Sequence, residues 1–272
     1  MGMNACILDW LENLAEIGAF KGQSSILELG PQDFNFSPES LFQLASRRLG
    51  QKEGRECARS IQDASISYEK RQELFYSMFG FEMYRSVDIY DQRASFRLDL
   101  NTATSAPSKF DVIIDCGTNE HIFNAGNVFV FTHNSLKVGG ISLKILPTFG
   151  DSTHGFYNFH PTVYFDVARE NSYQILDFRY IDDLMRRPAS RGAASLFSQD
   201  ELAHGLRSFS GSATVHERIL RSFLAILKNA DQQGRLSWTH YSIDYCFVAM
   251  KKKSDLPFRY PGQGMYQIEF QS

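Results

Sequence analysis

The chain has 272 residues, 43% hydrophobic and 14% aromatic, so it can bury a sizeable core and overall disorder is excluded. A formal net charge of −3 disfavours a general nucleic-acid binder, because phosphate binding requires a basic face. No stretch approaches the ~20 apolar residues that cross a bilayer, the N-terminus lacks the basic region of a signal peptide, and the four cysteines show no CxxC spacing. We therefore expect a soluble, cytoplasmic protein with reduced thiols.

The first third of the chain is predicted to contain three helices and one short strand. A short strand is expected at 26–29, and Ser37 with Pro38 predicts a helix that Gly50 ends. The polar segment 50–65 is predicted to be a loop, and 67–81 an amphipathic helix ending at Gly80. The first 21 residues form the remaining helix, whose apolar face has helical spacing: Ile7, Trp10, Leu11, Leu14 and Ile17.

Strands and helices then alternate. Strands are predicted at 83–91, at 94–100 and at 110–118, the last nearly all apolar, as in a strand buried on both faces. A helix is expected over 121–140, closed by Gly139 and Gly140, followed by a strand at 141–148 that Pro147 ends. The segments 173–182 and 241–252 are also strand-like. This alternation predicts a doubly wound α/β fold with a mostly parallel sheet.

Acidic residues follow the strands at the edge where ligands bind in open parallel sheets. Successive strands end in Glu28, Asp88, Asp99 and Asp115. A single acid there is usually hydrated or caps a helix. Four of them favour a ligand with several hydrogen-bond donors, such as ribose hydroxyls, an adenine amino group and an ammonium.

The motifs LELGPQD, SVDIYD, LDLN, FDVIIDCGTNEH and LKVGG together resemble, in order and spacing, those of class I S-adenosylmethionine-dependent methyltransferases. GTNEHIFN and HGFYNFHPTVYFDVA are similar to a bacterial subgroup that acts on small molecules. The resemblance implies a Rossmann-like, seven-stranded sheet of the methyltransferase type with an antiparallel C-terminal strand and helical additions. We expect one domain over 1–272, with an N-terminal helix at 1–21, a cofactor-binding core at 22–181, a helical lid or interface at 182–240, and a final strand and tail at 241–272.

The resemblance also implies the residues that bind S-adenosylmethionine. Glu28 and Gly30 would face the amino-acid end of the cofactor. Asp88 would hold the ribose hydroxyls, and Asp99 would accept a hydrogen bond from the adenine amino group. The wall near the sulfonium would be Asp115, Cys116 and Gly117. The full implied set is Glu28, Gly30, Gln32, Asp33, Asp88, Ile89, Asp99, Leu100, Asp115, Cys116 and Gly117.

The loop after the first strand departs from the family pattern, which commonly has two or three glycines. Here Pro31, Gln32 and Asp33 stand in their place, and Pro31 cannot donate a backbone N–H. We expect the side chains of Gln32 and Asp33 to do what bare backbone does elsewhere. A dinucleotide-binding protein is disfavoured, because a pyrophosphate needs the GxGxxG loop and Asp33 would repel it.

Methyl transfer requires an aligned acceptor and, for a hydroxyl, a base, which is usually a histidine. His121 follows Glu120 after the fourth strand and is either the base or a packing residue, while Glu120 is expected to favour the positive end of the following helix. The aromatic-rich segment 154–165 is expected to close over the acceptor. The candidate catalytic residues are His121, His154, Tyr157 and His160.

Other sites are disfavoured. No cysteine joins His154 and His160, which lack helical metal-pair spacing, so we expect no metal site. The sequence also lacks the GxSxG motif that would indicate a hydrolase.

The expected function is methylation of an oxygen or nitrogen atom of a small, biosynthetic metabolite. We expect no nucleic-acid or membrane partner and allow for a homodimer. Two alternatives stay open: displacement within S-adenosylmethionine that releases methylthioadenosine, and a non-catalytic cofactor-binding partner protein.

Overall fold

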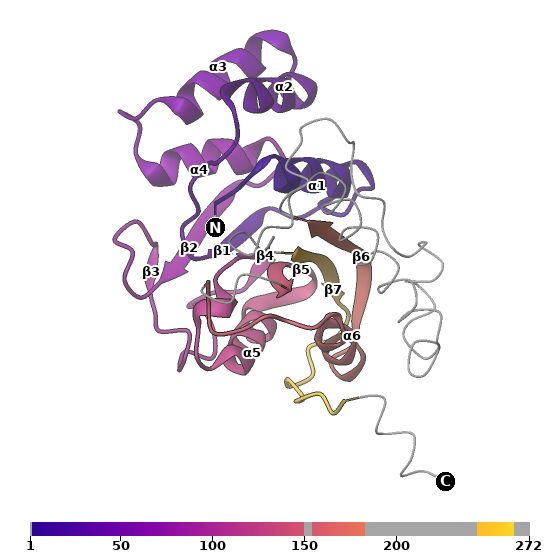
Figure 1. Cartoon of the computed structure of the whole chain (residues 1–272). Coiled ribbons are helices and arrows are strands. Elements are labelled where there is room, and N and C mark those ends of the chain that lie inside the picture. Colours follow the sequence, from indigo (N-terminus) through magenta and orange to yellow (C-terminus); the bar gives the residue numbers. More distant parts are fainter. Residues whose placement is uncertain (1, 150–153, 183–243, 264–272) are drawn as a thin grey trace, which may run out of the picture.

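The computed structural model describes residues 2–149, 154–182 and 244–263 (Figure 1), and these form one twisted sheet flanked by helices. The strand order is β3-β2-β1-β4-β5-β7-β6. Strands β1 to β5 pair in parallel, whereas β7 is antiparallel to both β5 and β6. The strands are β1 (Ser25–Leu29), β2 (Met83–Asp88), β3 (Phe96–Arg97), β4 (Phe110–Cys116), β5 (Leu136–Phe149), β6 (Tyr173–Asp182) and β7 (Asp244–Lys252). This confirms the predicted seven-stranded fold of the methyltransferase type.

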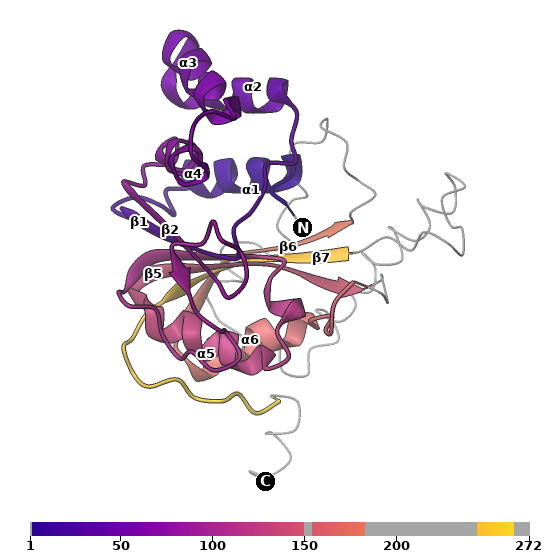
Figure 2. The ribbon, with the colours of Figure 1, turned by 90° about the vertical axis from the view of Figure 1, so that its left-hand side faces the viewer.

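Helices cover both faces of the sheet (Figure 2). In this edge-on view α1 and α4 lie on one face, α5 and α6 lie on the other, and the α2–α3 pair lies beyond α4, farthest from the sheet. The helices are α1 (Ala5–Glu16), α2 (Pro38–Leu49), α3 (Gln51–Gln62), α4 (Tyr68–Ser77), the 3₁₀ turn η1 (Asn119–His121), α5 (Ala125–Ser135) and α6 (Pro161–Glu170). Among the described residues, no helix has both the length and the apolar character needed to cross a membrane.

Helix α1 forms where its apolar spacing predicts it and packs its buried face on the sheet. Trp10 is buried in this interface, and its indole Nε1 donates a hydrogen bond of 2.7 Å to Asp177 Oδ2 in β6. Ile17 was expected on the same apolar face, but it follows the last helical residue as the C-cap and is 60% exposed. Helix α1, near the start of the chain, is thereby hydrogen-bonded to β6, the strand at one edge of the sheet.

Helix α2 begins and ends as predicted, with the Ser37 hydroxyl accepting from Ser40 N and Gly50 following its last residue at φ +89°. The prediction of a loop over 50–65 is wrong, because α3 occupies most of that segment. Gly54 packs so closely on α2 that an added Cβ would lie 2.6 Å from the Ala45 carbonyl carbon. The segment is mostly polar, and only three of the α3 residues are buried, so its sequence did not indicate an amphipathic helix. The buried residues are Gly54, Ala58 and Ile61.

The predicted helix over 121–140 is too long. Helix α5 ends at Ser135, and the following residues form the start of β5, where Leu136 pairs with Phe110 of β4. Strand β5 continues through Pro147 to Phe149, with an irregular register against β7 at that point. Of the predicted insertion, residues 183–240 lie outside the described residues.

Candidate functional site

The carboxyl ends of the parallel strands meet at one edge of the sheet, and the turn after β1 is built around Gly30. Its φ of +72° favours glycine, and an added Cβ would lie 2.5 Å from Thr118 Oγ1. The Gly30 N–H donates to the Val87 carbonyl at 2.8 Å, and the Thr118 hydroxyl donates to the Leu29 carbonyl at 2.6 Å. The loops after β1 and β4 are therefore joined directly by a hydrogen bond, and Gly30 leaves room for the Thr118 side chain between them.

Glu28 lies inside the protein rather than at the surface of this edge. Its Oε1 accepts from the Tyr76 hydroxyl at 2.8 Å, and its Oε2 accepts from the Tyr84 hydroxyl at 2.6 Å. Tyr68 and the Gln32 N–H also donate to Oε2, at 3.3 and 3.1 Å. Complete burial raises the pKa of Glu28 to about 7, although these hydrogen bonds oppose the rise. The expectation that Glu28 faces a ligand directly is not met, since its oxygens are engaged by the protein.

The Gln32 side chain is also turned inward. It is 4% exposed, and its Nε2 donates to the Gly30 carbonyl at 3.1 Å, while its Oε1 is buried without a hydrogen-bond partner among the described residues. Asp33 is exposed instead, and its Oδ1 accepts from Arg93 Nη1 at 2.5 Å. Arg93 lies over the Tyr68 ring at 4.6 Å. Gln32 thus supports the turn from behind, and Asp33 forms its outer side.

Asp88 is the last residue of β2 and lies one position beyond Val87, the residue paired with Leu29. Its Oδ1 accepts from the backbone N–H groups of Tyr90 and Asp91 at 2.7 and 2.9 Å. Its Oδ2 makes no hydrogen bond among the described residues. The carboxylate is therefore oriented by the turn that follows, which also contains the half-buried Ile89, and one oxygen remains available at the strand edge.

Asp99 lies beyond β3, which ends at Arg97 rather than at Asp99 as predicted. Its Oδ1 accepts from both the backbone N–H and the side-chain amide of Asn101, each at 2.8 Å, and these bonds lower the pKa of Asp99. Leu100 is 3% exposed, and its carbonyl accepts from the Asn127 side chain of α5 at 2.8 Å. The Asp99 turn is thereby fixed to the first turns of α5.

Asp115 is buried and does not line a surface wall. Its Oδ2 lies 3.0 Å from Lys144 Nζ, and its Oδ1 accepts from the N–H groups of Thr118 and Asn119 at 3.2 Å. Cys116 is 0% exposed within the core, where burial raises the pKa of its thiol. Of the implied sulfonium wall, Asp115 and Cys116 are interior, while Gly117 forms the turn at φ +74°.

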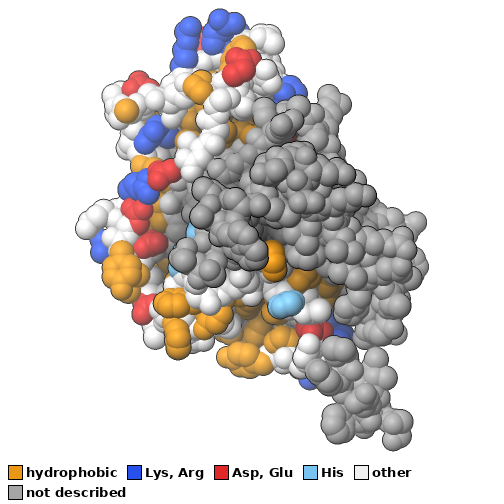
Figure 3. Space-filling view, viewed as in Figure 1, with side chains coloured by type: hydrophobic (Ala, Val, Ile, Leu, Met, Phe, Trp, Pro, Cys, Tyr) orange, Lys and Arg blue, Asp and Glu red, His pale blue; other side chains and the backbone are white. Residues whose placement is uncertain are grey.

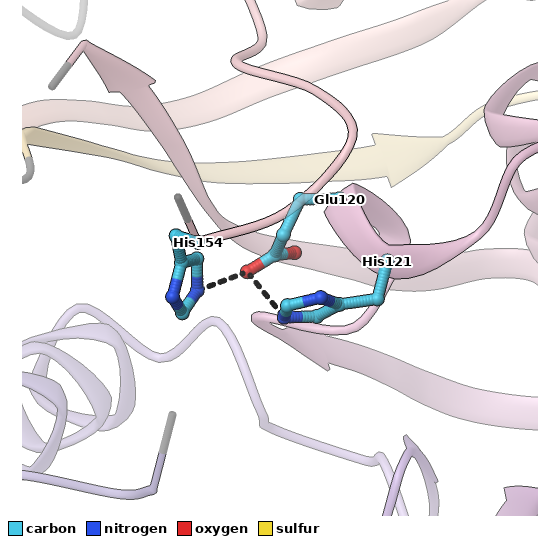
Figure 4. Close-up of side chains that lie close together, drawn as sticks. All are labelled: Glu120, His121 and His154. Atoms are coloured by element: carbon cyan, nitrogen blue, oxygen red, sulfur yellow. Dashed lines mark ion pairs between the residues drawn. The ribbon is translucent and has the colours of Figure 1, made fainter. Parts of the chain in front are cut away.

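Glu120, His121 and His154 come together just beyond this turn (Figure 4). The Nε2 atoms of His154 and His121 lie 3.5 and 3.9 Å from Glu120 Oε1, and the two imidazole centroids are 4.9 Å apart. The Glu120 side chain is 0% exposed, whereas those of His121 and His154 are 44% and 23% exposed. Partial burial lowers the pKa of His121, although the nearby Glu120 charge opposes this. We call these three residues the Glu-His-His group.

Backbone contacts fix the group. The Phe156 N–H donates to the Glu120 carbonyl at 2.7 Å, and a Cβ at Gly155 would lie 2.9 Å from that carbonyl oxygen. A residue without a side chain thus lets the segment after β5 reach η1. Neither carboxylate oxygen of Glu120 has a hydrogen-bond partner among the described residues, and the same is true of the buried Asn119 side chain.

Tyr157 and His160 lie outside this group. The Tyr157 hydroxyl donates to the Phe123 carbonyl at 2.7 Å. Phe123 and Phe156 are 72% and 64% exposed, and their rings meet edge to face with centroids 5.9 Å apart. Hydrophobic side chains gather on the lower part of the described surface in Figure 3. His160 is exposed as the N-cap residue of α6. We call Phe123, Phe156 and Tyr157 the aromatic rim.

The sequence did not identify several residues that build the site. Glu120 was expected only to favour a helix end, yet it is the centre of the Glu-His-His group. Its link to His154 depends on how the segment after β5 crosses η1. The supporting residues that the sequence did not reveal are Tyr68, Tyr76, Tyr84, Thr118 and Lys144. Paired tyrosines on one helical face were the only hint of the cluster around Glu28.

Comparisons with known proteins give distant matches only. No family model and no curated protein matches the chain. TehB from Haemophilus influenzae aligns at 10% identity over 89% of this chain and 62% of that one, with a TM-score of 0.44. An O-methyltransferase from a Brevibacillus brevis trans-AT PKS multienzyme, in complex with S-adenosyl-L-homocysteine, aligns at 13% identity over 95% and 82%, with a TM-score of 0.37. Haemonchus contortus phosphoethanolamine N-methyltransferase 2, in complex with S-adenosyl-L-methionine, aligns at 15% identity over 90% and 53%, with a TM-score of 0.40.

The chain therefore spans less than two thirds of the TehB chain and about half of the Haemonchus enzyme. These identities and TM-scores are too low to support an activity. The fold assignment depends on the strand order and on the antiparallel β7 described above.

Proposed function

We propose that this chain is an S-adenosylmethionine-dependent methyltransferase that acts on an oxygen or nitrogen atom of a small metabolite, in a biosynthetic role. The observation that carries the proposal is the placement of the Gly30 turn, Asp88 and Asp99 after successive strands of a β3-β2-β1-β4-β5-β7-β6 sheet. S-adenosylmethionine, when bound, supplies a methyl group already activated by a sulfonium. The protein then has to bind this cofactor, align the acceptor with the methyl group and exclude water.

The residues at the strand edge fit an adenosyl group. Asp88 and Asp99 each use Oδ1 to accept local N–H groups, and Oδ2 of each is left to accept from a ligand. Such hydrogen bonds suit ribose hydroxyls at Asp88 and an exocyclic amine at Asp99, with Ile89 and Leu100 beside the base. Pro31 has no N–H to donate to a pyrophosphate, and the exposed Asp33 already pairs with Arg93, so neither residue offers an anion a donor there. The chemistry of this edge therefore supports a cationic nucleoside.

Glu28 and Asp115 would act from behind this surface. Glu28 accepts the Gln32 N–H and so holds the turn after β1, while Asp115 accepts the N–H groups at the start of η1. Both carboxylates would position backbone that faces the ligand rather than contact it.

The Glu-His-His group would face the acceptor. Glu120 and His121 follow β4, the strand next to β1, and His154 follows β5, so two partly exposed imidazoles lie beside a buried carboxylate. Neutral imidazole nitrogens can accept the acceptor's proton, and the nearby Glu120 carboxylate would stabilise the imidazolium that forms. The aromatic rim beside His121 and Gly155 would contact an apolar part of the acceptor, and the net charge of −3 favours a small metabolite over a nucleic acid.

The test is calorimetric binding of S-adenosylhomocysteine to the wild type, Asp88→Ala and Asp63→Ala. Asp63 is a matched control, because its Oδ1 also accepts the backbone N–H two residues ahead, yet it lies in the exposed turn between α3 and α4. We expect Asp88→Ala to bind at least ~10-fold more weakly, equivalent to about 1.4 kcal/mol, and Asp63→Ala to bind like the wild type. Absence of wild-type binding, or equal affinity in both variants, would refute the proposal.

A further inference from the structure

We propose that Glu120, His121 and His154 bind a divalent first-row transition-metal ion, and that this ion holds an oxygen atom of the acceptor. The metal site is inferred from the described side chains alone. The role toward the acceptor depends on the proposed function.

The three residues are close to the geometry of a shared ion. One ligand atom from each lies within 4.8 Å of the others. Ligand atoms at about 2.1 Å from one ion lie roughly 3.0–3.4 Å apart, so the 3.5 Å distance from His154 to Glu120 is nearly suitable already. The 3.9 Å distance from His121 to the same oxygen needs a shift of about half an ångström, which a side chain that is 44% exposed can make.

The buried carboxylate is the second observation that points to a cation. Glu120 is 0% exposed, and both of its oxygens lack a hydrogen-bond partner among the described residues. An ionised carboxylate in this position is costly unless a charge or a donor compensates it. The Lys144 ammonium does not do so, since it donates to Asp115 and Thr132 instead, and the two imidazoles do so only when they are protonated. A bound divalent ion would supply the missing compensation.

The donor set indicates the class of ion. Two imidazoles with one carboxylate suit zinc, iron, cobalt or manganese rather than calcium or magnesium, which prefer oxygen ligands. Three protein ligands leave at least one coordination position open, as in catalytic rather than structural zinc sites. Because His121 and His154 are 44% and 23% exposed, an ion bound by them would not be fully enclosed by the described residues. A hydroxyl bound at the open position would lose its proton more easily, which favours a hydroxyl acceptor over an amine. With their Nε2 atoms on the ion, His121 and His154 would position the acceptor, and its proton would pass to solvent.

The experiment uses the full chain, stripped of metal by a chelator and titrated with CoCl₂ in the absence of S-adenosylmethionine and of any acceptor. Visible absorption reports on cobalt coordination, and calorimetry with ZnCl₂ gives stoichiometry. We expect one saturable site whose affinity falls at least ~10-fold in Glu120→Gln, in His121→Ala and in His154→Ala. His160→Ala removes an exposed imidazole outside the group and should bind like the wild type.

Circular dichroism checks that each variant is folded, and the exposed His121 gives a variant that spares the core if Glu120→Gln unfolds. No saturable site, or equal metal affinity in the wild type and His121→Ala, would overturn the inference. The affinity for S-adenosylhomocysteine is measured in a separate experiment without metal. A failure of metal binding therefore does not affect the test of cofactor binding, and the reverse also holds. A metal site without cofactor binding would contradict the proposed function alone.

Discussion

The Lys144 ammonium lies 3.0 Å from Asp115 Oδ2, and the two side chains are 1% and 0% exposed. The residues are direct neighbours in the parallel register of β4 and β5. Since the other Asp115 oxygen accepts the N–H groups of Thr118 and Asn119, this buried ion pair orients the turn that leads into the Glu-His-His group.

Replacing Lys144 with Met should destabilise the protein by about 3–5 kcal/mol, because Asp115 would remain as an uncompensated buried charge. Urea denaturation followed by circular dichroism measures this. Lys137→Met is the matched control, since Lys137 pairs with Asp111 at 3.0 Å but is 45% exposed and should cost no more than about 1 kcal/mol. Equal losses in both variants would contradict the importance of burial.

The buried Glu28 should make stability depend on pH. Burial raises the pKa of Glu28 from 4.5 to about 7, so its stabilising contribution is fully present below pH 4.5 and is lost as the pH rises to about 7. At 1.36 kcal/mol per pKa unit the loss is about 3 kcal/mol. Relative to Glu28→Gln, the wild type should therefore lose unfolding free energy between pH 4.5 and 7.5. Denaturant titrations at several pH values measure the difference, and a pH-independent difference would show that the pKa is not raised.

Gly30→Ala should be more damaging than an alanine at another glycine of similar backbone conformation. Gly18 has φ +77° with nothing within 4 Å of an added Cβ, so Gly18→Ala measures the backbone penalty alone, about 1–2 kcal/mol. Gly30→Ala adds the contact with Thr118 Oγ1 and should exceed that value. The double variant Gly30→Ala with Thr118→Ala should recover part of the excess. Thermal and denaturant unfolding test all three, and equal costs for Gly18 and Gly30 would disprove the crowding.

Asp99 should determine which base the protein prefers. If its free Oδ2 accepts from an exocyclic amine, the wild type will bind S-adenosylhomocysteine more tightly than S-inosylhomocysteine, which has an oxygen there instead. Asp99→Ala should reduce this preference at least several-fold, whereas Asp88→Ala should weaken both ligands by a similar factor. Calorimetry with the two ligands measures the ratio. An unchanged ratio in Asp99→Ala would remove Asp99 from adenine recognition.

The positions of most strands and the turn at Gly30 could be predicted because they follow from local patterns, whereas the seven-stranded arrangement was expected only from the resemblance to a known family. Apolar runs that end in an acid identify parallel strands, and Ser37 with Pro38 identifies a helix start. Helix α3 could not be predicted, since its buried face consists of Gly54, Ala58 and Ile61 in an otherwise polar segment. The boundary between α5 and β5 was missed because residues 136–140 owe their conformation to pairing with β4.

In the candidate site, too, local patterns predicted some features, and others depend on how distant elements pack together. Position after a strand predicted that Asp88 would lie at the sheet edge, but it could not show that Glu28 faces inward toward three tyrosines. Those tyrosines come from α4 and β2, so only the packing of these elements reveals the cluster. The approach of His154 to Glu120 likewise depends on the path of the chain after β5 and on the missing side chain at Gly155.

The hydrogen bond from Gly30 N to the Val87 carbonyl extends the β1–β2 ladder one residue beyond the last paired strand residue. The turn at Gly30 and the Asp88 carboxylate are thus parts of one hydrogen-bonded unit before any ligand arrives. This unit therefore loses little conformational entropy when a ligand binds. Substitutions in β2 that shift its register against β1 would then weaken affinity for the ligand without removing any direct contact with it.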